Sequence, residues 1–306
     1  MKKLILTFAA LLTFGAAMAQ TTVRRTVSIN GRRVTSTDGT KTSLKEIDRL
    51  AYRITYRTQS AEDLDVKDTA AIDYGLDDMR LDIGDRTSKF YSYTDLRHDS
   101  LMTDQAAKGD FNFKNVGPSG SLHWTVYRNY PEGKTLLLTR SGVDNYRIIE
   151  DTLTPEWDIV GDSVKTILDY PCTLATTTFK GRTWRAWYTE DIPLDNGPWK
   201  LCGLPGLILS AQDTEAHFIF EAVGLQQMDG SQPITYDPKC DDDEQISFSE
   251  FVEAQRRATP GAMLNSMGGG SSKIKITMMH EDGTEFSDTE MQQWLNKADP
   301  YNPIER

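Results

Sequence analysis

The sequence predicts a mainly β fold of the α+β class, in which a largely antiparallel sheet, curved or closed, carries a few appended helices. Two observations predict this class. Many short segments alternate apolar and polar residues with a period of two, as strands with one buried face do. These segments follow one another at near-regular spacing with turn residues between them, and helical signals are fewer, which favours an antiparallel sheet.

The predicted strands run along most of the chain. Residues 50–58 are typical, because Tyr52, Ile54 and Tyr56 share one face of an extended segment. The other predicted strands are residues 89–94, 122–130, 135–139, 146–151, 173–179, 183–189, 216–221 and 273–278. Lys180-Gly181 separates two of these strands and is typical of a tight hairpin turn.

Three helices are predicted. They cover residues 99–107, 247–257 and 287–296. The second has the clearest signals, because Ser247 and Glu250 have the spacing of a capping box and Pro260 follows as a stop. Residues 268–272 read Gly-Gly-Gly-Ser-Ser, which predicts a flexible break between the second and third helices.

The beginning of the chain has the three parts of a secretory signal peptide. Two lysines precede an apolar run at residues 4–16, and the small residues Ala17 and Ala19 mark the cleavage position. The alternative, a membrane anchor, needs ~20 apolar residues, and this run is shorter. We therefore expect residues 1–19 to be removed, leaving a single β-rich domain over residues 20–306. This domain should be periplasmic, with an association with the outer membrane left open, and should not span a membrane.

Composition limits the class of partner. The 306 residues are enough to bury a sizeable core, and the 9% aromatic content argues against a disordered chain. The formal net charge of −11 argues against sequence-independent nucleic-acid binding, which needs a basic face. We therefore expect no nucleic-acid partner.

If the chain is exported, two of its three cysteines can form a disulfide, because a disulfide persists in an oxidising compartment. Cys172 and Cys202 would close a loop of about 30 residues, which stabilises a fold by ~3–4 kcal/mol in the chain-entropy model. This pair is the candidate disulfide. The alternative is that Cys172, Cys202 and Cys240 are three buried or unpaired thiols.

The most distinctive motifs lie between residues 157 and 225. They include Phe179-Lys180-Gly181-Arg182, Ala186-Trp187-Tyr188-Thr189, Gly197-Pro198-Trp199-Lys200 and Gly203-Leu204-Pro205-Gly206-Leu207-Ile208. With these motifs the chain resembles the GLPGLI family of exported proteins from Bacteroidota, whose six-residue signature is complete here. Residues 301–305 also resemble the tail of that family.

The resemblance implies a secreted protein of the cell envelope, of unestablished activity and without assigned catalytic residues. It also implies a fold similar to half-open antiparallel barrels such as the periplasmic lipoprotein carriers, although a shared fold does not determine function. Cys172 fits a position where the family has cysteine, whereas Cys202 and Cys240 match no position that can be assigned.

The six-residue motif allows two interpretations. Gly203, Pro205 and Gly206 favour a chain reversal, and the apolar residues among them must be buried or covered by a partner. In the first interpretation the motif is a buried corner that ties two strands, with the neighbouring tryptophans in the core. In the second, aromatic residues form an apolar pocket, a concave face or a docking patch. The candidate ligand or partner surface then consists of Trp184, Trp187, Tyr188 and Trp199.

The sequence contains no GxSxG, P-loop, GxGxxG or HExxH motif. We therefore expect a non-catalytic binding or accessory protein for an apolar ligand, a peptide or another envelope protein, with no catalytic residues, no cofactor and no metal. One alternative is an accessory or hydrolytic component of nutrient uptake at the outer membrane, in which Glu190 or Asp191 would face His123 or His217 across a cleft. The other alternative is a structural component of the envelope.

Overall fold

The computed structural model describes residues 25–29, 32–36, 44–61, 72–108, 120–142, 144–262, 284–298 and 301–306. The chain divides into two compact units, and each is described by itself. The larger unit consists of Lys41–Arg140, Asn145–Val252 and Pro300–Arg306, and the smaller of Met1–Thr40, Ser141–Asp144 and Glu253–Asp299. The expected signal peptide lies outside the described residues, and the single domain over residues 20–306 stays a prediction.

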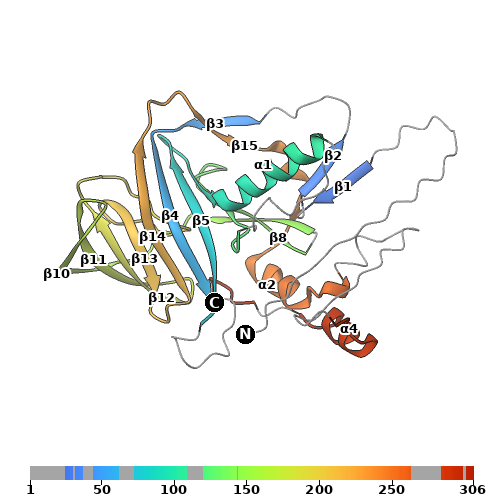
Figure 1. Cartoon of the computed structure of the whole chain (residues 1–306). Helices are drawn as coiled ribbons and strands as arrows, with labels where there is room; N and C mark the ends of the chain where they lie inside the picture. The colour runs from blue at the N-terminus through green and yellow to red at the C-terminus, as the bar shows by residue number, and fades with distance from the viewer. Residues whose placement is uncertain are drawn as a thin grey trace. The chain divides into compact units, whose positions relative to one another are not determined.

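The larger unit is built mainly on a twelve-stranded sheet with the order β10-β11-β12-β13-β14-β4-β5-β6-β7-β8-β9-β16 (Figure 1). These strands are, in chain order, β4 (Tyr52–Ala61), β5 (Tyr74–Ile83), β6 (Ser88–Ser92), β7 (Thr125–Arg128), β8 (Lys134–Ser141), β9 (Asp144–Asp151), β10 (Asp158–Ile167), β11 (Tyr170–Phe179), β12 (Arg182–Thr189), β13 (Leu207–Asp213), β14 (Phe218–Gln227) and β16 (Glu244–Gln245). A second, two-stranded sheet pairs β3 (Lys45–Arg49) with β15 (Pro233–Tyr236).

The mainly β fold with a curved sheet is confirmed. The neighbouring pairs from β10 to β8 are antiparallel, whereas β16 runs parallel to β9, so the sheet is mixed. The period of two predicted for residues 50–58 is present in β4, where Ile54 and Tyr56 are buried and Arg57 is exposed. Four strands of the sheet, β5, β10, β13 and β16, were not predicted.

The three predicted helices are present. They are α1 (Tyr93–Ala107), α2 (Phe248–Arg257) and α4 (Asp288–Leu295), with a short 3-10 helix, η3 (Pro238–Asp242), before α2. α1 begins earlier than predicted because the Ser92 Oγ accepts a hydrogen bond from the Asp95 N–H and caps the helix. None of the described helices is both long and apolar enough to cross a membrane.

The described part of the smaller unit holds a hairpin of β1 (Arg25–Ile29) and β2 (Arg32–Ser36) together with α4. The Ser287 side chain and the Glu290 side chain form a complete capping box at the start of α4. The predicted strand at residues 273–278 and the break at residues 268–272 lie outside the described residues.

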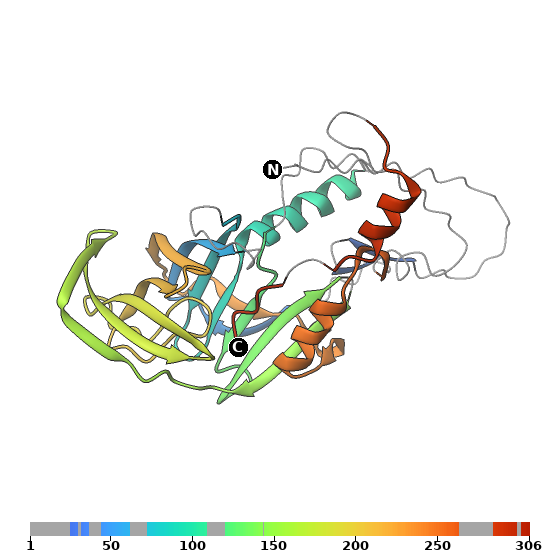
Figure 2. The same ribbon diagram turned by 90° about the horizontal axis from the view of Figure 1, so that it is seen from below.

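The main hydrophobic core lies on one face of the curved sheet. Fully buried side chains of the sheet, such as Tyr56 and Phe220, belong to one cluster with side chains from segments that are not strands. Trp199 and Leu204 come from the loop between β12 and β13, and Ile304 comes from residues 301–306. Figure 2 shows the end of this last segment, in red, between the yellow strands β11 and β12 and the green strands β8 and β9. The interior of the curved sheet is therefore filled by the protein itself.

Candidate functional site

Residues 301–306, which we call the tail, lie against charged side chains from several elements of the larger unit. We call these side chains the cradle. They are Glu150 of β9, Lys180 of the β11–β12 turn, Arg182 of β12, Lys200 of the β12–β13 loop, Asp213 of β13 and Glu215 of the β13–β14 turn. The tail and the cradle belong to the same compact unit.

The β11–β12 turn brings the backbone of the tail close. Lys180 and Gly181 both have positive φ, 52° and 77°, as the central residues of a type I′ hairpin do, so the predicted turn is confirmed. A Cβ on Gly181 would lie 2.6 Å from the carbonyl oxygen of Arg306, so glycine is needed for this approach. The Arg306 N–H donates to the Lys180 carbonyl oxygen at 3.0 Å.

Arg182 is the centre of the cradle. Its guanidinium donates to Oδ2 of Asp213 at 2.6 Å, to Oδ1 of Asn302 at 2.6 Å, and to the carbonyl oxygens of Pro303 and Ile304 at 2.6 and 2.9 Å. The residue is only 2% exposed. Burial lowers the pKa of Arg182, and the Asp213 carboxylate partly opposes this shift. Arg182 is therefore a buried charge with an ionic partner.

Two lysines and two glutamates form the second part of the contact. The Lys200 ammonium lies 2.5 Å from Glu150 and 2.5 Å from Glu305, and the Lys180 ammonium lies 2.7 and 3.1 Å from the same two carboxylates. Burial raises the pKa of Glu150, but Lys200 and Lys180 outweigh this, and the net pKa lies below the usual range. Each charge therefore has two partners of opposite sign, and Glu305 of the tail is one of them.

A small cavity lies beside this network. Its lining includes Glu150, Lys180, Trp199 and Lys200, and its volume is about 10 Å³. A cavity of this size has room for about one water molecule, whereas a pocket for a small ligand has ~300–1,000 Å³. This cavity is therefore not a substrate pocket.

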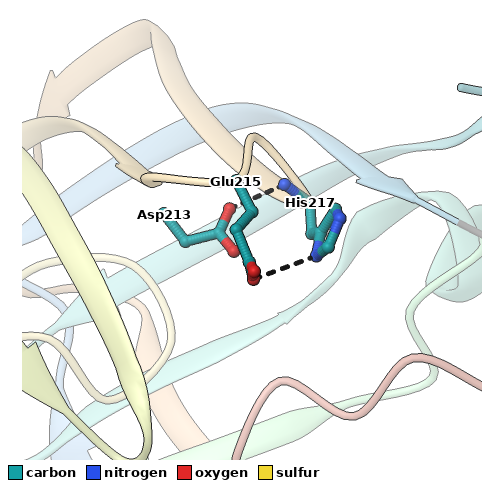
Figure 3. Close-up of side chains that lie close together, drawn as sticks. All are labelled: Asp213, Glu215 and His217. Atoms are coloured by element: carbon teal, nitrogen blue, oxygen red, sulfur yellow. Dashed lines mark hydrogen bonds and ion pairs between the residues drawn. The ribbon is translucent and has the colours of Figure 1, made fainter. Parts of the chain in front are cut away.

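Asp213, Glu215 and His217 form a cluster of possible metal ligands (Figure 3), whose ligand atoms all lie within 4.8 Å of one another. Carboxylate and imidazole groups are ligands that zinc accepts. However, the guanidinium of Arg306 lies 2.6 Å from Glu215 and 3.3 Å from Nδ1 of His217, and Arg182 binds the third ligand. Two guanidinium groups thus supply the positive charge that a metal would bring.

Burial lowers the pKa of His217, so its imidazole is neutral at physiological pH and adds no charge to the cluster. The cluster therefore works as an ion-pair network that holds the tail. Sequence reasoning missed the cradle because its residues are far apart in the chain, although the motifs at residues 179–182, 197–200 and 301–305 contain several of the residues in contact.

The four residues of the predicted ligand surface do not share one face. Trp184, Tyr188 and Trp199 are buried in the core, where the rings of Trp184 and Trp199 lie 5.5 Å apart. Only Trp187 is partly exposed, and the Lys165 ammonium lies 4.7 Å from its ring centre. A binding role for Trp187 stays a prediction.

The six-residue motif forms a buried corner. Gly203 has φ of 92°, and Leu204, Leu207 and Ile208 are buried as the chain enters β13. A Cβ on Gly206 would lie 2.0 Å from the carbonyl oxygen of Thr189, so only glycine fits. This geometry matches the first interpretation of the motif, a corner that ties β12 to β13.

The predicted disulfide is not formed in this structure. Cys172 and Cys202 are both free, buried thiols with separate surroundings. The Cys172 thiol donates to the carbonyl oxygen of Tyr170 at 3.4 Å. The Cys202 thiol donates to the carbonyl oxygen of Leu153 at 3.9 Å. Burial raises the pKa of both thiols, which makes them poor nucleophiles.

The hydrolytic alternative needs Glu190 or Asp191 to face His123 or His217, and the described contacts of these histidines are to other residues. Nδ1 of His123 lies 2.6 Å from Asp95, and His217 contacts Glu215 and two arginines. The Glu190 carboxylate accepts a hydrogen bond from Tyr188 instead of facing either histidine. The carboxylate–histidine pair that this alternative needs is therefore not assembled.

A second polar cluster lies where β6 meets α1. The Ser92 hydroxyl donates to the buried Asp77 carboxylate at 2.8 Å, and the Leu122 N–H donates to the same group at 3.2 Å. Burial raises the pKa of Asp77 to about 6, although these hydrogen bonds oppose the shift. Because the Ser92 Oγ also accepts from the Asp95 N–H and caps α1, this cluster positions the start of that helix.

A family model matches residues 177–210, and its description is "Protein of unknown function (Porph_ging)". The matched residues contain Lys180, Arg182, Lys200 and the six-residue motif, that is, half of the cradle and the buried corner. No curated protein matches the chain.

Two solved structures are similar to the chain at 15% identity, namely PNGF-II in the P21 and C2 space groups. Their TM-scores are 0.43 and 0.42, and each alignment covers 67% of this chain. It covers 33% and 32% of those chains, so this chain spans about a third of their length. These likenesses assign no activity.

Proposed function

We propose that the protein is an exported, non-catalytic binding protein of the periplasm that recognises an extended segment of a polypeptide partner at the β10 edge of its sheet. The signal-peptide pattern of residues 1–19 supports export. The filled interior of the sheet favours a partner that binds on the outside over an apolar ligand held within.

The observation that carries the proposal is the exposure of β10. This strand pairs with β11 alone, and it is at the end of the sheet in Figure 1. Ile159, Val160 and Val164 are 53%, 37% and 63% exposed, and they are three of the nine large hydrophobic side chains exposed among the described residues. An outer strand with exposed apolar side chains can accept a further strand from another polypeptide.

The charge around β10 indicates the chemistry of the partner. Asp158 and Asp162 of the strand are exposed, and Glu156 just before it is also exposed. The register shift between Val160 and Val164 separates two short stretches that can pair. We expect a segment in which apolar and basic residues alternate, because it would cover the apolar side chains and neutralise the acidic ones.

The test uses a fluorescein-labelled ten-residue peptide of alternating Val and Lys, with binding followed by fluorescence anisotropy. A double substitution, Ile159→Lys with Val164→Lys, should weaken binding by about tenfold or more, because it removes apolar contact and repels the peptide. The matched control is Leu76→Lys with Val223→Lys, which changes two exposed apolar residues of β5 and β14 by the same charge. The control should bind as the unaltered protein does.

Equal loss of affinity in both double variants would mean that peptide binding depends only on the net charge of the protein. Absence of binding to the unaltered protein would reject β10 as the site. Hydrogen exchange supplies a second readout. The amides of β10 should gain protection with the peptide present, whereas the amides of β5 should not change.

A further inference from the structure

We propose that the cradle is a peptide-binding site that recognises the sequence Asn-Pro-Ile-Glu-Arg, is occupied by the chain's own tail, and accepts a free peptide of that sequence in its place. This inference concerns the tail and the cradle, and it does not depend on binding at β10.

The tail belongs to the larger unit, although the residues that precede it in the sequence are assigned to the smaller unit. The chain leaves the larger unit after Val252 and passes through the smaller unit as Glu253–Asp299. It returns to the larger unit only at Pro300.

The larger unit contacts side chains of the tail as well as its backbone. The Asn302 side chain accepts from Arg182 at 2.6 Å and donates to the carbonyl oxygen of Ala61 at 3.3 Å. Ile304 is buried in the core, and Glu305 lies between Lys180 and Lys200. The sequence of the peptide should therefore matter at these positions.

Contacts outside the tail hold the cradle in shape. Oδ1 of Asp213 accepts from the N–H groups of His217 and Phe218 at 2.7 and 3.0 Å, which fixes the carboxylate that binds Arg182. The Arg182 guanidinium also lies 4.8 Å from the ring centre of Phe218. Glu150 forms ion pairs with both Lys180 and Lys200. A binding site that is already arranged loses less freedom when its ligand enters.

Tyr301 provides the matched control. Its hydroxyl is buried and has no hydrogen-bond partner in the structure, while its ring lies 6.0 Å from that of Phe251. Replacement by phenylalanine keeps the ring and removes a group that makes no hydrogen bond. Recognition through the described contacts predicts that this change leaves affinity almost unaltered.

The experiment uses the full chain with a protease recognition sequence inserted between Asp299 and Pro300, cut after the protein has folded. Native mass spectrometry then asks whether the cut tail stays bound and whether an isotope-labelled peptide of residues 300–306 exchanges into the complex. Peptide variants Asn302→Ala and Glu305→Gln should bind about tenfold or more weakly, because each loses hydrogen bonds to a charged group. The Tyr301→Phe peptide should bind within about twofold of the natural sequence.

Retention of the cut tail with exchange and this ranking of variants supports the proposal. A cut protein that keeps its circular dichroism spectrum but does not take up the peptide would show that only the covalent tether holds the tail. Unfolding after the cut would show that the tail is an inseparable part of the fold. Equal affinity for all four peptides would reject recognition by sequence.

Discussion

At the scale of the residue, the buried charge of Arg182 depends on groups that are distant in the chain. Two of its acceptors are backbone carbonyls of the tail, and another is the Asp213 carboxylate. A guanidinium presents several N–H groups in a fixed plane, which an ammonium cannot reproduce. The side chain therefore joins two strands and the tail in one geometry.

Arg182→Lys should destabilise the fold by about 3 kcal/mol, because the positive charge remains buried but loses most of its acceptors. Urea unfolding followed by circular dichroism measures the change. Arg185→Lys is the matched control, since Arg185 lies on the same strand but is exposed, and its effect should stay within about 0.5 kcal/mol. Similar effects of the two substitutions would contradict a special role for Arg182.

The buried Asp77 predicts a dependence of stability on pH. Its folded pKa is about 6, above the ordinary 3.8, so between these pH values the folded chain binds a proton that the unfolded chain lacks. The contribution of Asp77 to stability therefore increases as the pH falls from about 6 to about 4. The unfolding free energy of the natural protein minus that of Asp77→Asn should be larger at pH 4.5 than at pH 7, by on the order of 2 kcal/mol. An equal difference at both pH values would contradict the raised pKa.

The cysteines give a prediction that separates the structure from the candidate disulfide. Cys240 is half-buried, whereas Cys172 and Cys202 are buried. A thiol reagent should label Cys240 first in the folded protein and all three cysteines after unfolding without reductant. Two cysteines that stay unlabelled until a reductant is added would establish a disulfide instead.

At the scale of the element, short sequence motifs correctly predicted the caps and turns that depend on neighbouring residues. The capping box at Ser247 and Glu250 is present, as is the turn at Lys180-Gly181. β5 was not predicted, yet its acidic residues Asp77 and Asp82 are buried and bind partners on other strands. Such pairing cannot be inferred from the segment itself.

The corner between β12 and β13 gives a prediction at this scale. Gly206→Ala would place a Cβ 2.0 Å from the Thr189 carbonyl oxygen, so the two strands must separate. We expect a loss of about 3 kcal/mol or a failure to fold, measured by urea unfolding and by yield of soluble protein. Gly161→Ala is the control, because a Cβ there meets nothing within 4 Å. A well-folded Gly206→Ala protein of unchanged stability would contradict the close approach.

At the scale of the whole molecule, the fold class and the positions of α1, α2 and α4 followed from the sequence, whereas the cradle did not. A mainly β fold requires only that short alternating segments recur. The cradle requires that residues 150, 182, 213 and 305 meet, and this meeting depends on the strand order of the complete sheet. The filled interior likewise could not be predicted, because the loop and the tail that fill it lack a periodic pattern.

Export leads to a prediction for the mature chain. If residues 1–19 are a signal peptide, protein recovered from the periplasm of its own cells should begin at Gln20, as measured by intact mass and amino-terminal sequencing. Replacing both Lys2 and Lys3 with glutamate should slow processing, because the positive region before the apolar run is lost. A protein that retains Met1 in the periplasmic fraction would contradict cleavage.

The contact between Ala61 and Asn302 also governs when the molecule can finish folding. The two residues are 241 positions apart, and Arg182 has no acceptors from the tail until residues 302–304 have been synthesised. Until then Arg182 has the Asp213 carboxylate as its ionic partner but lacks its three acceptors from the tail. Contacts of such long range also slow folding, because a large loop must close before they form. A core that depends on these contacts therefore becomes compact late in folding.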